Sequence, residues 1–103
     1  MRHMDLVREY ACHPRNVSTA PTDGRAPRWF WVSAENNRVT VSSGRTPYAN
    51  SSIRGQRTLQ EREMETMLAL YRRRKRGEPV SAEASRATQN QVYWYGIFAD
   101  LKL

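Results

Sequence analysis

The strongest structural signal in this chain comes from residues 29–43, which have the sequence WFWVSAENNRVTVSS. Two runs rich in aromatic and β-branched residues, 29–32 and 39–43, flank an Asn-Asn pair, and this pattern predicts a β-hairpin. Asparagine tolerates the positive φ that a tight hairpin turn needs. In the second run Val39 and Val41 alternate with polar residues, so this strand has one buried and one solvated face. The first run is apolar on both faces, and we therefore expect both of its faces to be covered.

A helix over residues 58–76 is the clearest element after the hairpin. Thr58 and Glu61 match the capping-box pattern at its start. Gly77 and Pro79 prevent its continuation at the other end. The apolar residues that recur at helical spacing and mark its buried face are Met64, Met67, Leu68 and Tyr71.

The remaining segments give weaker signals. Residues 81–90 are predicted as helix, while 91–103 fit either a strand, by their aromatic content, or a helix continuing from the residues before them. Helix is the favoured alternative. Residues 13–28 and 44–57 are rich in Pro, Gly and small polar residues, which predicts loops. The segment 5–10 fits a short strand or one helical turn.

These elements together predict an α+β fold. It is a small antiparallel sheet containing the 29–43 hairpin, packed by the 58–76 helix and a C-terminal helical or strand element. A length of 103 residues predicts one small domain over 1–103. Residues 1–3 resemble a cloning remnant, with Met4 as the natural start, and they carry no functional inference.

The net charge of +7 comes mostly from five consecutive basic residues, 72–76. On the predicted helix Arg72, Arg73 and Arg76 point away from the apolar face. None of the five has an acidic residue three or four positions before it, so the helix itself supplies no pairing partner. We expect an external anion to compensate such a cluster, and nucleic-acid phosphate is the commonest one. The alternative is a solvated basic face, which is favourable at a helix C-terminus.

The functional hypothesis is a non-enzymatic nucleic-acid-binding domain that contacts phosphates through this basic helix end. Arg72, Arg73 and Arg76 form the predicted contact, helped by Arg54 and Arg57 from the preceding loop.

Two dense aromatic clusters support an alternative function. Aromatic residues in a domain of this size belong mostly to the core, but a thin core does not hold all of them. We therefore expect one cluster to lie at the surface, as a base-stacking platform or an interface. The alternative is a homodimeric interaction protein or a small-ligand-binding protein. The residues predicted to line that ligand site or interface are Trp29, Trp31, Tyr93 and Trp94.

The sequence gives little support for catalysis. Cys12 and His13 are adjacent and have no obvious third partner, so a small ribonuclease using His13 ranks third. We expect no metal site, because one native histidine and one cysteine are too few ligands, and no cofactor, because no Gly-rich phosphate loop is present. The single cysteine and the lack of a signal peptide or spanning segment predict a cytoplasmic protein with no membrane partner.

Overall fold

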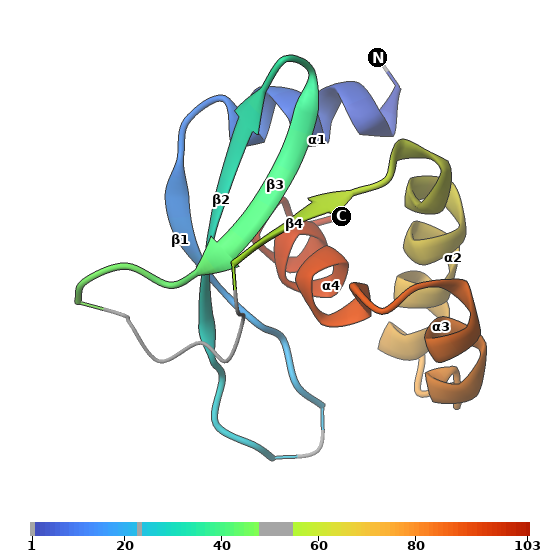
Figure 1. The fold of residues 1–103 in the computed structure, drawn as a ribbon. Coiled ribbons are helices and arrows are strands. Elements are labelled where there is room, and N and C mark those ends of the chain that lie inside the picture. Colours follow the sequence, from blue (N-terminus) through green and yellow to red (C-terminus); the bar gives the residue numbers. More distant parts are fainter. Residues whose placement is uncertain (1, 23, 48–54) are drawn as a thin grey trace.

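The computed structural model describes residues 2–22, 24–47 and 55–103. The fold is α+β, as predicted, with one antiparallel sheet and several helices (Figure 1). The strands are β1 (Arg15–Ser18), β2 (Trp29–Glu35), β3 (Arg38–Ser43) and β4 (Gln56–Leu59). The helices are α1 (His3–Ala11), the short 3-10 helix η1 (Glu61–Glu63), α2 (Met64–Lys75), α3 (Ser81–Ala87) and α4 (Gln91–Asp100).

The predicted hairpin is confirmed and forms the centre of the sheet. Strands β2 and β3 pair from Phe30 opposite Ser43 to Glu35 opposite Arg38. The turn between them is Asn36-Asn37, with φ values of 52° and 63°, which is the left-handed conformation that asparagine tolerates. β1 pairs with the other edge of β2, and β4 with the other edge of β3, so the sheet order is β1-β2-β3-β4.

The sequence predicts neither edge strand: it indicates a loop at β1, and the end of a loop and the start of a helix at β4. β1 falls within the predicted 13–28 loop, where Val17 pairs opposite Phe30 and is buried. β4 includes the first residues of the predicted 58–76 helix, because Thr58 and Leu59 pair with β3. Both segments are short and largely polar, and pairing with the central hairpin determines their conformation more than their own propensity does.

The start of the long helix is therefore corrected. The capping box consists of Gln60 and Glu63, in which the Gln60 backbone N–H donates to the Glu63 carboxylate over 3.3 Å. The Thr58–Glu61 pair is not the cap, since Thr58 belongs to β4. The rest of the helix agrees with the prediction, with Gly77 at a φ of 87° directly after it.

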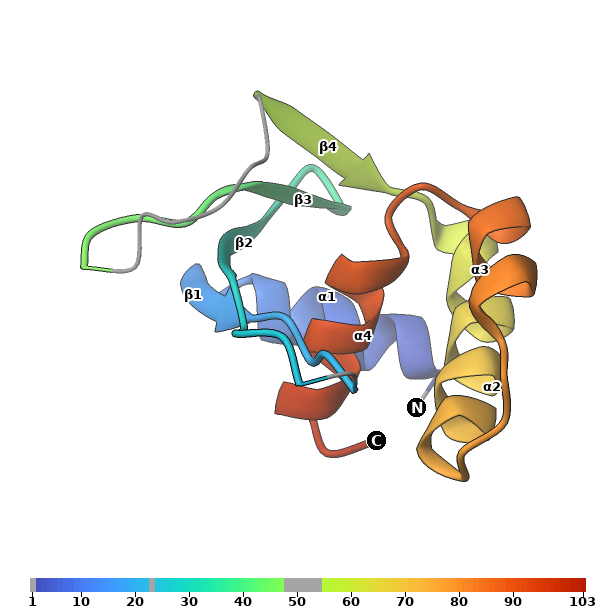
Figure 2. The ribbon, with the colours of Figure 1, turned by 90° about the horizontal axis from the view of Figure 1, so that it is seen from below.

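All helices that the structure describes lie on one side of the sheet (Figure 2). α1 packs on β2 and β3, α4 packs against β1, and α2 packs on α4. The inward side chains of the hairpin and the inner faces of α1, α2 and α4 form the core. Its largest fully buried side chains are Trp94, Phe30, Phe98, Met64, Met67, Leu68 and Ile97.

The C-terminal segment adopts the favoured alternative, a helix. α4 follows a break at Thr88, whose backbone is extended, so α3 and α4 are separate helices. α4 approaches the sheet closely at Gly96. A Cβ on Gly96 would lie 2.7 Å from the Ser18 carbonyl oxygen and 2.9 Å from the Phe30 ring. The absence of a side chain at this position therefore sets the distance between α4 and the sheet.

Candidate functional site

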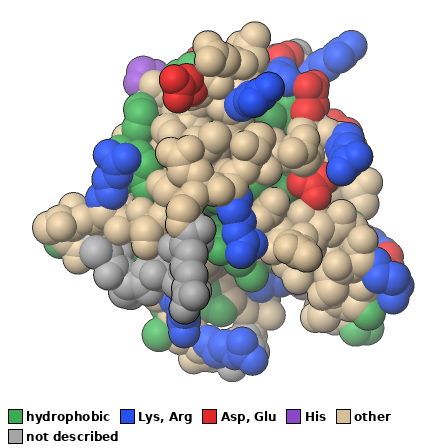
Figure 3. All heavy atoms as spheres, in the orientation of Figure 1, with side chains coloured by type: hydrophobic (Ala, Val, Ile, Leu, Met, Phe, Trp, Pro, Cys, Tyr) green, Lys and Arg blue, Asp and Glu red, His purple; other side chains and the backbone are tan. Residues whose placement is uncertain are grey.

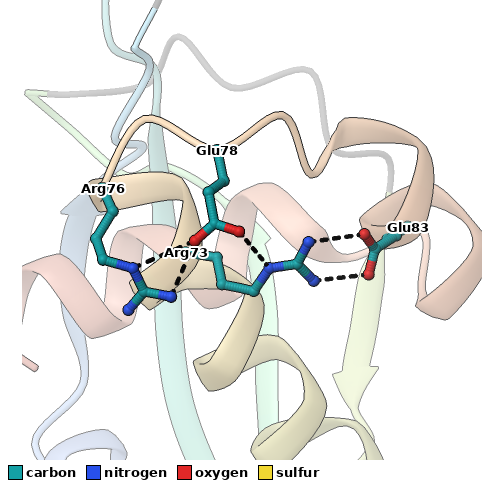
Figure 4. Close-up of polar contacts among 4 residues, drawn as sticks. All are labelled: Arg73, Arg76, Glu78 and Glu83. Atoms are coloured by element: carbon teal, nitrogen blue, oxygen red, sulfur yellow. Dashed lines mark hydrogen bonds and ion pairs between the residues drawn. The ribbon is translucent and has the colours of Figure 1, made fainter.

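Two of the five basic residues at the end of α2, Arg73 and Arg76, are compensated by the protein's own carboxylates. The Arg73 guanidinium donates two hydrogen bonds to Glu83, at 2.8 and 2.9 Å, and its Nε donates to Glu78 over 3.1 Å. Arg76 donates to the other oxygen of Glu78 at 3.2 and 3.0 Å. Figure 4 shows the four side chains as one network, with Arg73 between the two glutamates.

The electrostatics agree with this geometry. The hydrogen bonds from Arg73 and Arg76 hold the pKa of the Glu78 carboxyl below its usual value, and the hydrogen bonds from Arg73 lower the pKa of Glu83. Both glutamates are therefore ionised at neutral pH and compensate the two arginines. For Arg73 and Arg76, this removes the argument that the helix end needs an external anion.

The helix itself contains neither Glu78 nor Glu83, because both residues follow it in the sequence. Glu78 and Glu83 come after Arg73 by five and ten residues. Gly77 reverses the chain with its positive φ, and α3 then runs back beside α2. The signal that was available is this turn, Gly77 with Pro79, followed closely by two acidic residues.

The other basic residues of α2 have different surroundings. The Arg74 guanidinium lies 4.5 Å from the centroid of the Tyr95 ring and donates to the Ala20 carbonyl over 2.6 Å. The Lys75 ammonium lies 5.4 Å from the Tyr71 ring. Arg72 is exposed and forms no ion pair with any residue that the structure describes. Of the three predicted helix-end contacts, only Arg72 keeps an uncompensated charge.

The two predicted loop contacts are separated from that helix end. Arg54 lies outside the described residues. Arg57 is on β4, where its guanidinium lies 6.0 Å from the Tyr93 ring and 3.5 Å from the Asn90 side-chain oxygen. No described contact joins Arg57 to the basic residues of α2.

The four predicted aromatic site residues divide into core and surface. Trp94 has no exposed surface and stacks on Phe98, so the prediction that it lines an exposed interface is wrong. Its position on the inner face of α4 explains this. Tyr93 is half-buried and packs edge-on against Phe30. Trp29 and Trp31 are half-buried as well, but they lie on the opposite side of the sheet from the core.

The side of the sheet that faces away from the helices is an open sheet face. Its residues alternate along each strand with the buried ones, and none of the described helices covers it (Figure 2). In Figure 3 the middle of this side is mainly backbone and uncharged polar side chains, with basic and some acidic side chains around it. Its members are Asn16, Ser18, Trp29, Trp31, Ser33, Glu35, Arg38, Thr40, Ser42, Gln56 and Thr58.

Trp31 is the centre of a small organised cluster on this face. It pairs between Asn16 of β1 and Ser42 of β3. The Arg45 guanidinium lies 4.3 Å from the centroid of the Trp31 ring. The Arg45 backbone N–H donates to the Asn16 side chain over 2.8 Å, and the Asn16 amide donates back to the Arg45 carbonyl over 3.0 Å. These two bonds fix the Arg45 backbone and hold its guanidinium over the ring. The Arg45 side chain therefore covers part of the Trp31 ring.

Arg38 and Arg45 carry positive charge at this face. Both are exposed, and neither forms an ion pair within the described ranges, although Glu35 is the cross-strand neighbour of Arg38. Arg57 on the edge strand β4 pairs with the buried Val41 and therefore faces the helical side of the sheet, where it contacts Tyr93 and Asn90. The predicted phosphate contacts did not include Arg38 and Arg45, because neither residue belongs to a run of basic residues. The available signal was their place beside the hairpin, with Arg45 two residues after β3.

The remaining sequence candidates add no catalytic arrangement. Cys12 and His13 follow α1 and are both exposed. Among the residues described, no three His, Cys, Asp or Glu side chains are grouped so that they could hold a metal ion. No helix in the described part of the chain has the length and apolar character needed to cross a membrane.

Two parts of the molecule thus carry several arginines, the end of α2, where Arg73 and Arg76 are ion-paired, and the open sheet face, where Arg38 and Arg45 form no described ion pair. Comparison with known proteins supplies no assignment for either, since no family model matches the sequence, no curated protein is similar to it and no solved structure matches its fold.

Proposed function

We propose that this protein is a non-enzymatic nucleic-acid-binding domain whose contact surface is the open sheet face and not the end of α2. The observation that carries the proposal is the Arg45 guanidinium held over the Trp31 ring on the open sheet face, where Arg45 forms no ion pair with a described residue. Arg38 lies at the other end of β3 and adds a second exposed positive charge to the same face. A strand of nucleic acid needs both a stacking surface and a cationic track for its phosphates.

The geometry favours single-stranded over double-stranded nucleic acid. Sequence-tolerant binding of single strands relies on aromatic rings or arginine planes on which bases stack. Arg45 on Trp31 offers such a surface, because its guanidinium is supported from below by the ring. The neighbouring Ser33 and Thr40 hydroxyls, 3.0 Å apart, and the amide of Gln56 offer hydrogen bonds to base edges or sugars. None of the described helices projects from this face into the groove of a duplex.

The test is a binding assay with a fluorescent single-stranded oligonucleotide and its duplex at several salt concentrations. Two arginines, Arg38 and Arg45, give an expected slope of about −1.4 in log affinity against log salt for a single strand. This corresponds to a loss of about 7-fold in affinity between 50 and 200 mM salt. Affinity for the duplex is expected to be lower.

A matched pair of double variants locates the surface. Replacing Arg38 and Arg45 together by Gln should abolish most of the binding and flatten the salt slope. The control replaces the exposed Arg72 and Arg86 by Gln, which removes the same charge from the helical side. Binding that survives the first double variant and disappears with the control would place the contact at the helices instead. Undetectable binding of the wild-type protein at low salt would refute the proposal.

Self-association through Trp29 and Trp31 is the second candidate function. It rests on the position of both half-buried tryptophans outside the core. Light scattering distinguishes it from the first candidate. A dimer that Trp31→Ala dissociates, in a protein that binds no oligonucleotide, would favour the interaction function.

A further inference from the structure

A hollow of about 180 Å³ lies on the other side of the molecule, between residues 19–21 and 25–28, the end of α2 and the start of α4. Its wall is mostly apolar. Val92, at the start of α4, is 45% exposed and is the only large hydrophobic side chain left exposed among the described residues. The apolar side chains that line the hollow are Ala20, Pro21, Ala26, Val92 and Tyr95.

The rim of the hollow is basic. Arg25, Arg28 and Arg74 line it, and none of the described lining residues is acidic. Arg74 is held in place by its bond to the Ala20 carbonyl and by the Tyr95 ring beneath it. Arg28 is exposed and forms no ion pair with a described residue. An apolar wall next to fixed guanidinium groups is complementary to a molecule with an apolar body and one anionic end.

We propose that this hollow binds a free, short aliphatic monocarboxylate, with its chain against Val92 and its carboxylate facing Arg28 and Arg74. The site lies outside the open sheet face, so the proposal is independent of nucleic-acid binding. Inorganic phosphate would satisfy the arginines but leave the apolar wall in water. A neutral apolar molecule would desolvate the arginines without pairing them.

The aliphatic character of the chain follows from the wall. The Tyr95 ring is buried and has the Arg74 guanidinium 4.5 Å from its centroid, so it contributes little open aromatic surface to the hollow. The alanines, the proline and the valine offer short aliphatic contacts on the remaining sides. Forked hydrogen bonds from a guanidinium suit a carboxylate geometrically.

The experiment is an NMR titration of the protein with butanoate, hexanoate and octanoate at constant ionic strength. Affinity should rise about fourfold for each added methylene until the hollow is filled. Amide shifts should map to Ala20, Ala26 and Val92. Hexylammonium, hexanol and inorganic phosphate should each bind at least tenfold more weakly than hexanoate.

Variants at the rim complete the test. Arg28→Gln should weaken hexanoate binding several-fold, and Val92→Asp, at an exposed position, should abolish it. Arg86→Gln on the exposed face of α3 is the charge-matched control and should leave it unchanged. An affinity independent of chain length, equal binding of hexylammonium, shifts that map elsewhere, or binding to anionic vesicles without binding to free carboxylates would each overturn the proposal.

Discussion

Replacing Gly96 by alanine tests the packing of α4 on the sheet. Gly96 is in the middle of α4 with an ordinary helical backbone, so on an exposed helix the change would stabilise the protein by about 1 kcal/mol. Here the new Cβ would lie 2.7 Å from the Ser18 carbonyl oxygen. Real Cβ atoms do not approach other atoms so closely, and something must move.

The neighbours of Gly96 have little freedom to move. Ser18 is paired with Trp29 in the β1–β2 ladder, so its carbonyl cannot retreat without disturbing the sheet. The Phe30 ring, 2.9 Å from the same position, is fully buried. Overpacking of this kind costs about 1–3 kcal/mol. Because both neighbours are fixed, the cost should lie near the upper end, at about 2–3 kcal/mol. After the gain of about 1 kcal/mol in helix propensity, we expect Gly96→Ala to destabilise the fold by about 1–2 kcal/mol.

Urea denaturation followed by circular dichroism measures this change. The midpoint should fall with an unchanged slope, and the melting temperature should drop by about 4–8 °C per kcal/mol. Thr66→Ala, at an exposed position of α2, is the control that changes helix propensity without a new contact. A Gly96→Ala protein as stable as the wild type, or more stable, would refute the close approach of α4 to β1.

Two further predictions concern single interactions. Tyr10→Phe removes the 2.5 Å hydrogen bond that the buried Tyr10 donates to Asp100, and it should lower the free energy of unfolding by about 1–3 kcal/mol. Tyr95→Phe removes a buried hydroxyl that has no partner among the described residues, so it should leave the stability unchanged or raise it. Urea denaturation of both variants compares the two effects. The Glu78 and Glu83 pKa values are lowered in the folded state, so their contribution to stability is present above their unfolded pKa of about 4.3 and is lost as the pH falls through the folded values. Melting temperatures between pH 6 and pH 3 should therefore fall more steeply for the wild type than for Glu78→Gln/Glu83→Gln, and identical profiles would contradict the network.

The elements that the sequence predicts correctly are those determined by neighbouring residues. The hairpin has its alternation and its Asn36-Asn37 turn within fifteen residues, and the end of α2 has Gly77 and Pro79 beside it. β1 and β4 are different, because RNVS and QRTL carry little strand propensity and become strands by pairing with the hairpin. The same reason explains the misplaced start of the long helix, since Thr58 looks like a cap until β3 is known to lie beside it.

The candidate site was harder to predict than the fold, because compensation of charge depends on contacts between distant segments. The cluster at 72–76 looks unpaired along its own helix, yet the turn at Gly77 brings Glu78 and Glu83 onto Arg73. Arg45 looks unremarkable in the sequence, yet Asn16 from another strand fixes it over Trp31. Density of charge in the sequence is therefore a poor guide to charge available for binding. A phosphate competes with Glu78 and Glu83 for Arg73 and Arg76, whereas Arg45 has no described carboxylate partner and Glu35 lies across from Arg38 without an ion pair. This difference favours the open sheet face.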